Sequence, residues 1–178
     1  MKNNKLSIFI SLVLRHKPET IGIQLDEHGW ADVKELIEGI NNTGRCIDKE
    51  LLEEIVKNDQ KNRYSFSEDK MLIRANQGHS IPVDVELEER IPPSILYHGT
   101  AKKVQDIIMQ QGIKSMSRLY VHLSTDYETA KKVGNRHGDP VVLKIAASEM
   151  YATGIKFYLS VNGIWLTKYV DKRFIIAE

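Results

Sequence analysis

The chain has 178 residues, of which 42% are hydrophobic and 28% are charged, and it contains a single cysteine. This length is enough for one large domain or two small lobes with a buried core. The sequence has no run of about eighteen apolar residues, which excludes a transmembrane helix. The lone Cys46 excludes an internal disulfide and a cysteine-based zinc site, so we expect a reducing, cytoplasmic environment.

Charge is nearly balanced over the whole chain but not along it, with 25 Lys and Arg against 24 Asp and Glu. Residues 1–90 carry 13 basic and 17 acidic side chains, a net charge of −4, whereas residues 91–178 carry 12 and 7, a net charge of +5. A domain that binds nucleic acid through bulk charge has a pI above about 9. The pI here is about 7.8, so contact with RNA or DNA must depend on a few placed cations.

Helical spacing dominates the first part of the chain. Apolar side chains recur at helical intervals over residues 6–13, 33–40 and 51–56, which predicts three helices, the second capped by Asp32. Residues 64–67 and 71–74 resemble two short strands around a turn. Three helices followed by a β-hairpin are typical of a winged helix.

A proline-marked stretch at residues 82–94 predicts the boundary between two lobes, residues 1–90 and 91–178. Beyond it we expect strands at 95–97, 120–123, 141–145, 157–159, 164–166 and 174–176, and helices at 102–111 and 127–133. We expect Thr100 to cap the first of these helices, residues 124–126 to cap the second, and Asn162-Gly163 to form a hairpin turn. The fold class is therefore α+β, and no G-x-G-x-x-G motif supports a dinucleotide-binding βαβ fold.

None of the six histidines forms a close pair at metal-ligand spacing, so we expect no metal site. The sequence also contains no G-x-S-x-G elbow and no phosphate-binding G-x-x-x-x-G-K-[ST] loop. These absences remove the commonest hydrolase and NTPase functions.

Polar residues cluster where elements are expected to end, at residues 15–18, 74–80, 97–100, 118–124 and 134–138. Arg15 and His16 could converge on an anion, or could simply be cations favoured by the dipole at a helix C-terminus. His122 could be a ligand or a hydrogen-bonded core group, since it alternates with Val121 and Leu123 on a strand. The glycine-flanked basic loop at 134–138 could hold phosphates through backbone N–H groups and a guanidinium.

Taken in order, these segments resemble the NAD-dependent RNA 2′-phosphotransferase family. The resemblance is carried by residues 14–18, 73–80, 96–100, 121–124, 134–138 and 162–166. It implies an N-terminal winged-helix-like RNA-binding lobe and a C-terminal ADP-ribosyltransferase-like lobe that binds NAD⁺.

The resemblance also implies the reaction, in which an internal RNA 2′-phosphate of the tRNA splice-junction type attacks NAD⁺ and expels nicotinamide. The ADP-ribosylated 2′-phospho-RNA then yields 2′-OH RNA and ADP-ribose 1″,2″-cyclic phosphate. NAD⁺ is thus a consumed co-substrate, and the implied partner is 2′-phosphorylated RNA. We expect a monomer, no metal and no membrane partner.

The family's catalytic set is Arg-His-Arg-Arg. Arg15 and His16 match its first pair, Arg118 matches the arginine ahead of the V-H-L-S strand, and Arg63 is the candidate for the remaining arginine. Guanidinium groups stabilise the charge that builds up on a phosphodiester under attack. Of the four, His16 alone can exchange a proton near neutral pH.

The resemblance assigns the remaining site residues to the two substrates. The residues implied to bind NAD⁺ are His98, Gly99, Thr100, His122, Ser124 and Arg136. Those implied to bind RNA are Lys17, Arg74, Gln77, His79 and Ser80. Ile164 occupies the place where related ADP-ribosyltransferases often carry a glutamate, which fits an acceptor that is already anionic.

The acidic first lobe should repel RNA, and we hypothesise that Arg15, Lys17, Arg63 and Arg74 gather on its face toward the second lobe. Two other functions stay open. One is an ADP-ribosyltransferase acting on terminal nucleic-acid phosphates or another acceptor. The other is a winged-helix regulator that binds DNA, although its expected recognition helix carries more acid than base.

Overall fold

The computed structural model describes residues 2–176, with the side chains of residues 4–176. The described residues form six α-helices and four small antiparallel sheets, which confirms a mixed α+β fold. They divide into two compact units, Met1–Glu86 and Leu87–Glu178, which we describe separately.

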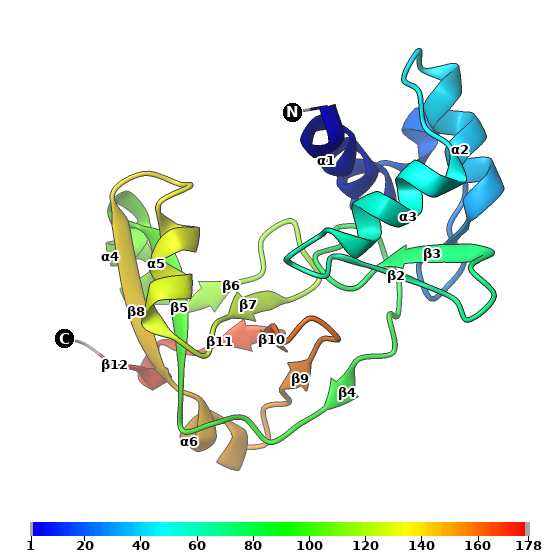
Figure 1. Ribbon diagram of the computed structural model, residues 1–178. Helices are drawn as coiled ribbons and strands as arrows, with labels where there is room; N and C mark the ends of the chain where they lie inside the picture. The colour runs from blue at the N-terminus through cyan, green and yellow to red at the C-terminus, as the bar shows by residue number, and fades with distance from the viewer. Residues whose placement is uncertain (1, 177–178) are drawn as a thin grey trace. The chain divides into compact units, whose positions relative to one another are not determined.

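The first unit contains the three predicted helices and the predicted hairpin (Figure 1). Its elements are α1 (Lys2–Arg15), the 3₁₀ turn η1 (Pro18–Ile21), β1 (Trp30–Asp32), α2 (Val33–Asn42), α3 (Lys49–Lys57), β2 (Tyr64–Phe66) and β3 (Leu72–Ala75). We did not predict β1, which pairs with β3 and completes a sheet of order β1-β3-β2. Three residues are too few to show the alternating pattern by which a strand is recognised.

Aspartates begin two of these helices, and the first of them, Asp32, is the cap that the sequence predicts. Asp32 accepts a hydrogen bond from the backbone N–H of Glu35 at 2.9 Å, and Asp48 accepts one from Leu51 at 2.8 Å. Each bond satisfies an N–H that has no partner within its helix, and such a cap stabilises a helix by about 1 kcal/mol.

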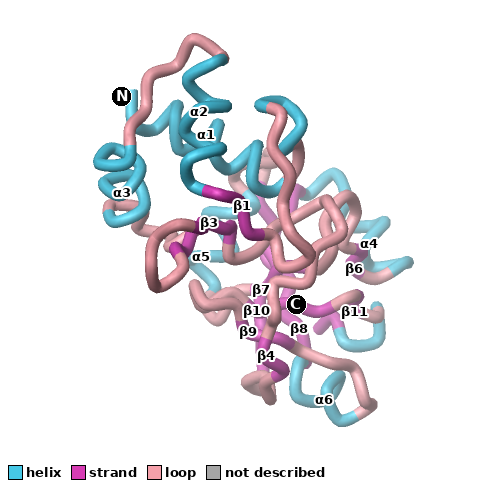
Figure 2. The backbone as a smooth tube through the Cα atoms, turned by 90° about the vertical axis from the view of Figure 1, so that its right-hand side faces the viewer, coloured by secondary structure: helices cyan, strands magenta, loops and turns pink. Residues whose placement is uncertain are grey.

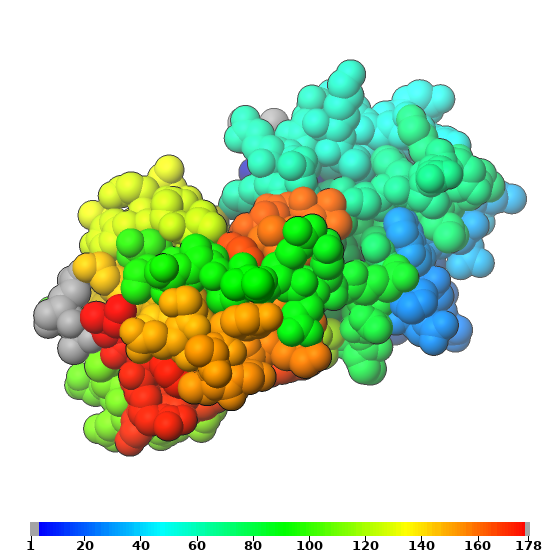
Figure 3. Space-filling model, turned by 90° about the horizontal axis from the view of Figure 1, so that it is seen from below, coloured from blue at the N-terminus to red at the C-terminus, as the bar shows by residue number. Residues whose placement is uncertain are grey.

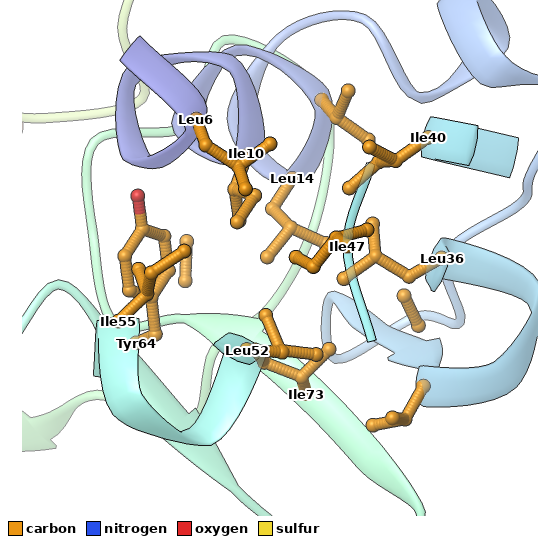
Figure 4. Close-up of a cluster of buried hydrophobic side chains, with 14 of the residues drawn as sticks. Leu6, Ile10, Leu14, Leu36, Ile40, Ile47, Leu52, Ile55, Tyr64 and Ile73 are labelled. Atoms are coloured by element: carbon orange, nitrogen blue, oxygen red, sulfur yellow. The ribbon is translucent and has the colours of Figure 1, made fainter. Parts of the chain in front are cut away.

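The helices of this unit cover the sheet with one apolar cluster (Figure 4). Its largest fully buried members include Ile10, Leu14, Leu36, Ile40, Leu52 and Ile73. Tyr64 also lies in this core, and its hydroxyl donates to the carbonyl oxygen of Ser7 at 2.7 Å. The ring is therefore buried without leaving its polar end unpaired.

The second unit is built from short strands with three helices. Its elements are β4 (Glu88–Glu89), β5 (Ile95–Ala101), η2 (Lys102–Val104), α4 (Gln105–Gln111), β6 (Ile113–Lys114), β7 (Val121–Leu123), α5 (Tyr127–Gly134), β8 (Pro140–Ala146), α6 (Ala147–Ala152), β9 (Tyr158–Leu159), β10 (Trp165–Thr167), β11 (Tyr169–Val170), η3 (Lys172–Phe174) and β12 (Ile175–Ile176). The sheet orders are β4-β9-β10-β7, β12-β8-β5 and β11-β6. Figure 2 shows the first of these sheets as a series of neighbouring strands.

A bridge between Tyr97 and Ser124 joins the two larger sheets of this unit. Each residue donates its backbone N–H to the carbonyl oxygen of the other, both at 2.8 Å. The bridge therefore holds the middle of β5 beside the end of β7. On the surface, α6 and η3 are neighbours, and Figure 3 shows the segments from orange to red side by side.

The prediction that Thr100 caps a helix is wrong. β5 pairs with β8 along its whole length, from Ile95 opposite Ala146 to Ala101 opposite Pro140, so Thr100 lies inside a strand and is buried. The next element begins as the 3₁₀ turn η2, which has no side-chain cap. The strand continues through Gly99 because the long pairing with β8 outweighs the local turn signal.

The other element boundaries either agree with the sequence prediction or belong to elements too short to be predicted. Asp126 caps α5 through the N–H of Thr129 at 2.7 Å, as predicted. The Asn162-Gly163 turn is also confirmed, since the N–H of Gly163 donates to the carbonyl oxygen of Ser160 at 2.8 Å. The two-residue strands β4, β6 and β11 and the short helix α6 were not predicted, because none is long enough to show a period.

Gly99 allows α5 to pack directly on β5. A Cβ on residue 99 would overlap the carbonyl oxygen of Ala130 and crowd the backbone nitrogen of Gly134. The aromatic rings of Tyr97 and Tyr127 meet edge-on at 6.3 Å beside this contact. The glycine therefore has a packing role whatever its part in ligand binding.

Gly99→Ala should destabilise the second unit by about 3 kcal/mol or more, because neither backbone can move without breaking strand or helix hydrogen bonds. Thermal unfolding and hydrogen exchange of the β5 amides measure this effect. Gly154→Ala is the control. Gly154 has φ +91° and faces open space, so the substitution should lower the free energy of unfolding by about 1 kcal/mol from backbone strain alone. A Gly99→Ala protein as stable as the wild type would contradict the packing role.

Candidate functional site: two cationic clusters

The first cluster lies at the C-terminal end of α1, where the chain returns after β3. The backbone N–H of Ser80 donates to the carbonyl oxygen of Arg15 at 3.0 Å, and its Oγ lies 2.9 Å from Nδ1 of His16. The Nε and Nη2 atoms of Arg15 are buried, and Gly78 packs against the same guanidinium. Arg15, His16 and Ser80, three residues predicted for the site, are therefore in contact.

His79 is buried within this cluster, with 2% of its surface exposed. Burial, followed by the positive charges of Arg15, His16 and Arg74, lowers its pKa to about 4. Its imidazole is therefore neutral at pH 7, and its Nε2 atom has no hydrogen-bond partner among the described residues. The side chain of His79 thus lies inside the cluster rather than at its surface.

Arg74 is held on the middle strand of the first sheet. Its guanidinium lies 4.4 Å from the ring of Trp30, the residue opposite it on β1, and Nη1 donates to Glu86 at 3.0 Å. Only 14% of the side chain is exposed. Glu86 offsets part of its charge, so Arg74 contributes a positioned cation rather than a free one.

Arg63 is oriented by a carboxylate that sequence reasoning missed. Its Nη1 pairs with Oδ1 of Asp59, and its backbone N–H donates to Oδ2 of the same residue at 2.6 Å. Asp59 is buried, and Asn62 in the intervening turn adopts φ +43°. Asp59 and Arg63 are four residues apart, but this spacing predicts an ion pair only if the segment between them is known to form a turn.

The two other residues predicted for RNA lie on this unit as well. Lys17 follows α1 and is exposed, whereas Gln77 is half-buried at the start of the returning segment. Lys17 thus follows the Arg15–His16 pair along the chain, and Gln77 directly precedes Gly78, which packs against the Arg15 guanidinium.

The second cluster lies on β5, β7 and the loops beside them. Nη1 of Arg118 lies 3.4 Å from Nδ1 of His122, and Nδ1 of His98 lies 3.1 Å from the carbonyl oxygen of His122. The carbonyl can only accept, so His98 carries a proton on Nδ1. Burial lowers the pKa of His98, which leaves Nε2 of the neutral ring as an acceptor.

Arg136 adds a further charge to this cluster. Partial burial, and then the proximity of Arg136, lower the pKa of Arg118, and His137 similarly contributes to lowering the pKa of His98. The ion pairs in the described part of this unit join Arg90, Lys156 and Arg173 to carboxylates, and none involves Arg118 or Arg136. Local positive charge therefore exceeds the local negative charge, as in sites that bind phosphate groups.

The other predicted NAD⁺ residues surround these side chains. Ser124 is bridged to β5 and half-buried, Thr100 is buried in β5, and Gly99 is covered by α5. His122 alternates with the buried Val121 and Leu123, as predicted, and is itself half-buried. The donors and cations fit an anionic dinucleotide with a pyrophosphate and an amide-bearing ring.

No group of three or more metal-ligating side chains occurs among the residues that the structure describes. Within the same residues, no helix has the length and apolar character needed to cross a membrane.

A mixed α+β fold with two arginine–histidine clusters defines a protein suited to phosphate-bearing substrates. Comparison with known families is more specific: residues 1–169 match the model described as RNA 2′-phosphotransferase, Tpt1 / KptA family. The chain therefore belongs to this family of transferase enzymes, and the resemblance stated from its motifs is confirmed.

Relatives match almost the full chain. A "Probable RNA 2′-phosphotransferase" of Fusobacterium nucleatum is 58% identical over 172 residues, 96% of each chain. Proteins with the same description from Flavobacterium johnsoniae and Pectobacterium carotovorum are 52% identical over 170 residues and 49% over 175. These matches cover 96% and 98% of this chain, and 93% and 94% of the relatives.

The buried His79 should make stability depend on pH. The unfolded imidazole binds a proton near pH 6.5 and the folded one near pH 4, so between these values the unfolded state holds more protons. The free energy of unfolding should therefore be about 2 kcal/mol lower at pH 5 than at pH 7 on account of this group.

Urea unfolding of the wild type and His79→Asn at both pH values tests this expectation. The variant should lose that part of the pH dependence, whatever its stability at pH 7. Equal pH dependence in the two proteins would mean that His79 is not held neutral by burial.

Proposed function

We propose that the protein removes an internal RNA 2′-phosphate by transferring it to NAD⁺. The path runs through an ADP-ribosylated 2′-phospho-RNA and gives 2′-OH RNA, nicotinamide and ADP-ribose 1″,2″-cyclic phosphate. The observation that supports this proposal is the proximity of Arg118 to Arg136 and to His122, with neither arginine in an ion pair among the described residues. Such a cluster favours a substrate that brings several negative charges.

In this proposal Arg15, Arg63 and Arg118 bind the oxygens of the transferred phosphate. Guanidinium groups keep their charge throughout, and a planar fork can donate two parallel hydrogen bonds to a phosphate. Negative charge grows on the equatorial oxygens when the phosphorus is attacked, so these contacts strengthen in the transition state. The pairing with Asp59 supports the role of Arg63, because it restricts the rotamers of a long side chain.

His16 is the proposed proton-transfer group. It is the one member of the set whose ordinary pKa lies near neutral pH, and it follows Arg15 directly at the end of α1. In the second step, His16 would take the proton that the attacking ribose 2″-hydroxyl loses, or would give a proton to the departing RNA 2′-oxygen.

The second cluster is the proposed NAD⁺ site. NAD⁺ supplies an anomeric carbon that accepts the phosphate and nicotinamide as the leaving group. His98, Gly99 and Thr100 would line the nicotinamide end, with His122 and Ser124 on the neighbouring strand. Arg136 would bind the pyrophosphate or the adenosine, supported by its proximity to Arg118.

RNA contacts are proposed for Lys17, Arg74 and Gln77, with His79 and Ser80 supporting the site from the same segment. The exposed Lys17 can reach a backbone phosphate, and Arg74 presents a cation that Trp30 and Glu86 already orient. These few positioned groups would compensate for the acidic character of the first lobe.

An ADP-ribosyltransferase acting on terminal nucleic-acid phosphates is the second candidate function. The half-buried aliphatic Ile164 favours an acceptor that is already anionic, which holds for either kind of phosphate. The DNA-binding regulator has less support: α3 has the sequence KELLEEIVK, whose charged residues are three glutamates and two lysines. That helix would repel a phosphate backbone.

A short RNA with one internal 2′-phosphate tests the proposal. Incubation with the purified protein should remove the phosphate only when NAD⁺ is present, with release of nicotinamide. A matched RNA with a terminal 5′-phosphate tests the second candidate, which predicts a stable ADP-ribosylated product. If the 2′-phosphate survives on intact RNA in the presence of NAD⁺, the proposed function is wrong.

Arg118→Ala should slow turnover by 10²- to 10³-fold, because it removes a charged donor to the transferred phosphate. If the second step is slowed more than the first, ADP-ribosylated RNA accumulates and is seen by gel shift and mass spectrometry. Arg173→Ala is the matched control, an exposed arginine of the same unit that pairs with Asp171. Equal activity of Arg118→Ala and the control would exclude Arg118 from the site.

Arg74→Ala should raise the KM for RNA by about 5- to 10-fold with kcat nearly unchanged, because an RNA contact outside the reacting phosphate affects binding alone. Steady-state kinetics at saturating NAD⁺ measure both constants. Arg45→Ala is the control, since Arg45 also lies over an aromatic ring, that of Phe9, and has no proposed part in the site. An unchanged KM would remove Arg74 from the RNA contacts.

A further inference from the structure

Ser80 makes two contacts with the Arg15–His16 pair, and they have different chemical consequences. The backbone N–H donates to the carbonyl oxygen of Arg15 at 3.0 Å, which fixes the chain against the end of α1. The hydroxyl lies 2.9 Å from Nδ1 of His16, which fixes one side of the imidazole ring. An exposed serine that only met solvent would make neither contact.

We propose that Ser80 is a positioning residue for His16: its hydroxyl holds Nδ1 and thereby aims Nε2 at the reacting phosphate. This proposal rests on the proposed function for the role of His16. It gives Ser80 a part in turnover rather than in RNA affinity.

The position of the hydroxyl is itself fixed by neighbouring residues. Gly78 packs against the guanidinium of Arg15, and the buried side chain of His79 anchors the segment between Gly78 and Ser80. The segment is therefore attached to the first unit directly before the residue that carries the hydroxyl. A hydrogen bond from an anchored group restricts ring rotation far more than one from a mobile side chain.

A hydroxyl is suited to a histidine that changes its protonation state. It can donate to Nδ1 when that nitrogen is bare and accept from it when it carries a proton. The contact therefore survives in both protonation states of the ring. A carboxylate in the same place could only accept, and it would favour the charged ring.

The test compares the full-length wild type with Ser80→Ala and Ser80→Thr. Loss of the hydroxyl should lower kcat by about tenfold, the effect of one hydrogen bond, with the KM for RNA and NAD⁺ within about twofold. Threonine keeps the hydroxyl at an exposed position and should restore kcat to within about threefold of the wild type. Ser67→Ala is the matched control, because Ser67 bonds Asp69 in the hairpin turn of the same unit.

A second readout needs no substrate. Nitrogen-15 NMR of the histidine rings, with His16 assigned through His16→Asn, reports which ring nitrogen carries the proton. The Nδ1 resonance of His16 should shift in Ser80→Ala, because its hydrogen bond is lost, and return in Ser80→Thr.

Wild-type kcat in Ser80→Ala, an effect confined to the KM for RNA, or an unchanged His16 spectrum would each overturn the proposal. If the wild type itself shows no phosphate transfer, the proposed function fails, and the NMR comparison still decides whether Ser80 orients the ring. The two failures are therefore distinguishable.

Discussion

The return of residues 77–80 to the end of α1 is the contact on which the candidate site of the first unit depends. α1 places Arg15 and His16 side by side, but the helix alone orients neither side chain. Ser80 supplies a backbone N–H to one and a hydroxyl to the other. Because this segment follows β3, the hairpin packed beneath α1 determines where those groups lie. The hydrophobic core of the unit is thus what aligns its polar groups.

The same contact brings several cationic side chains close together. In the first unit, one histidine stays neutral and carboxylates offset part of the remaining charge. His79 stays neutral, since burial among Arg15, His16 and Arg74 makes protonation costly. Asp59 offsets the charge of Arg63, and Glu86 offsets part of that of Arg74. In the second unit, neither Arg118 nor Arg136 is in an ion pair with a carboxylate among the described residues. The charge of these two arginines is available to a bound anion, which is the physical reason for the proposal that this cluster binds NAD⁺.

Much of the fold could be predicted, because α1, α2, α3 and α5 are long enough to show a period, and the last three of these begin at aspartate caps. The short strands β1, β4, β6 and β11 were not predicted, since their existence depends on partners distant in sequence. Thr100 shows the same limit, because pairing with β8 overrides its local preference for a cap. For the site, motifs identified residue types, but the pairing of Asp59 with Arg63 and the burial of His79 emerge only in three dimensions.

The fate of the phosphorus atom tests the central claim most directly. An RNA whose internal 2′-phosphate carries ³²P is incubated with the protein and NAD⁺, and the labelled products are separated and counted against released nicotinamide. The account predicts that the label moves to ADP-ribose cyclic phosphate, with one nicotinamide released for each phosphate removed. Label recovered as inorganic phosphate, or retained on the RNA, would contradict it.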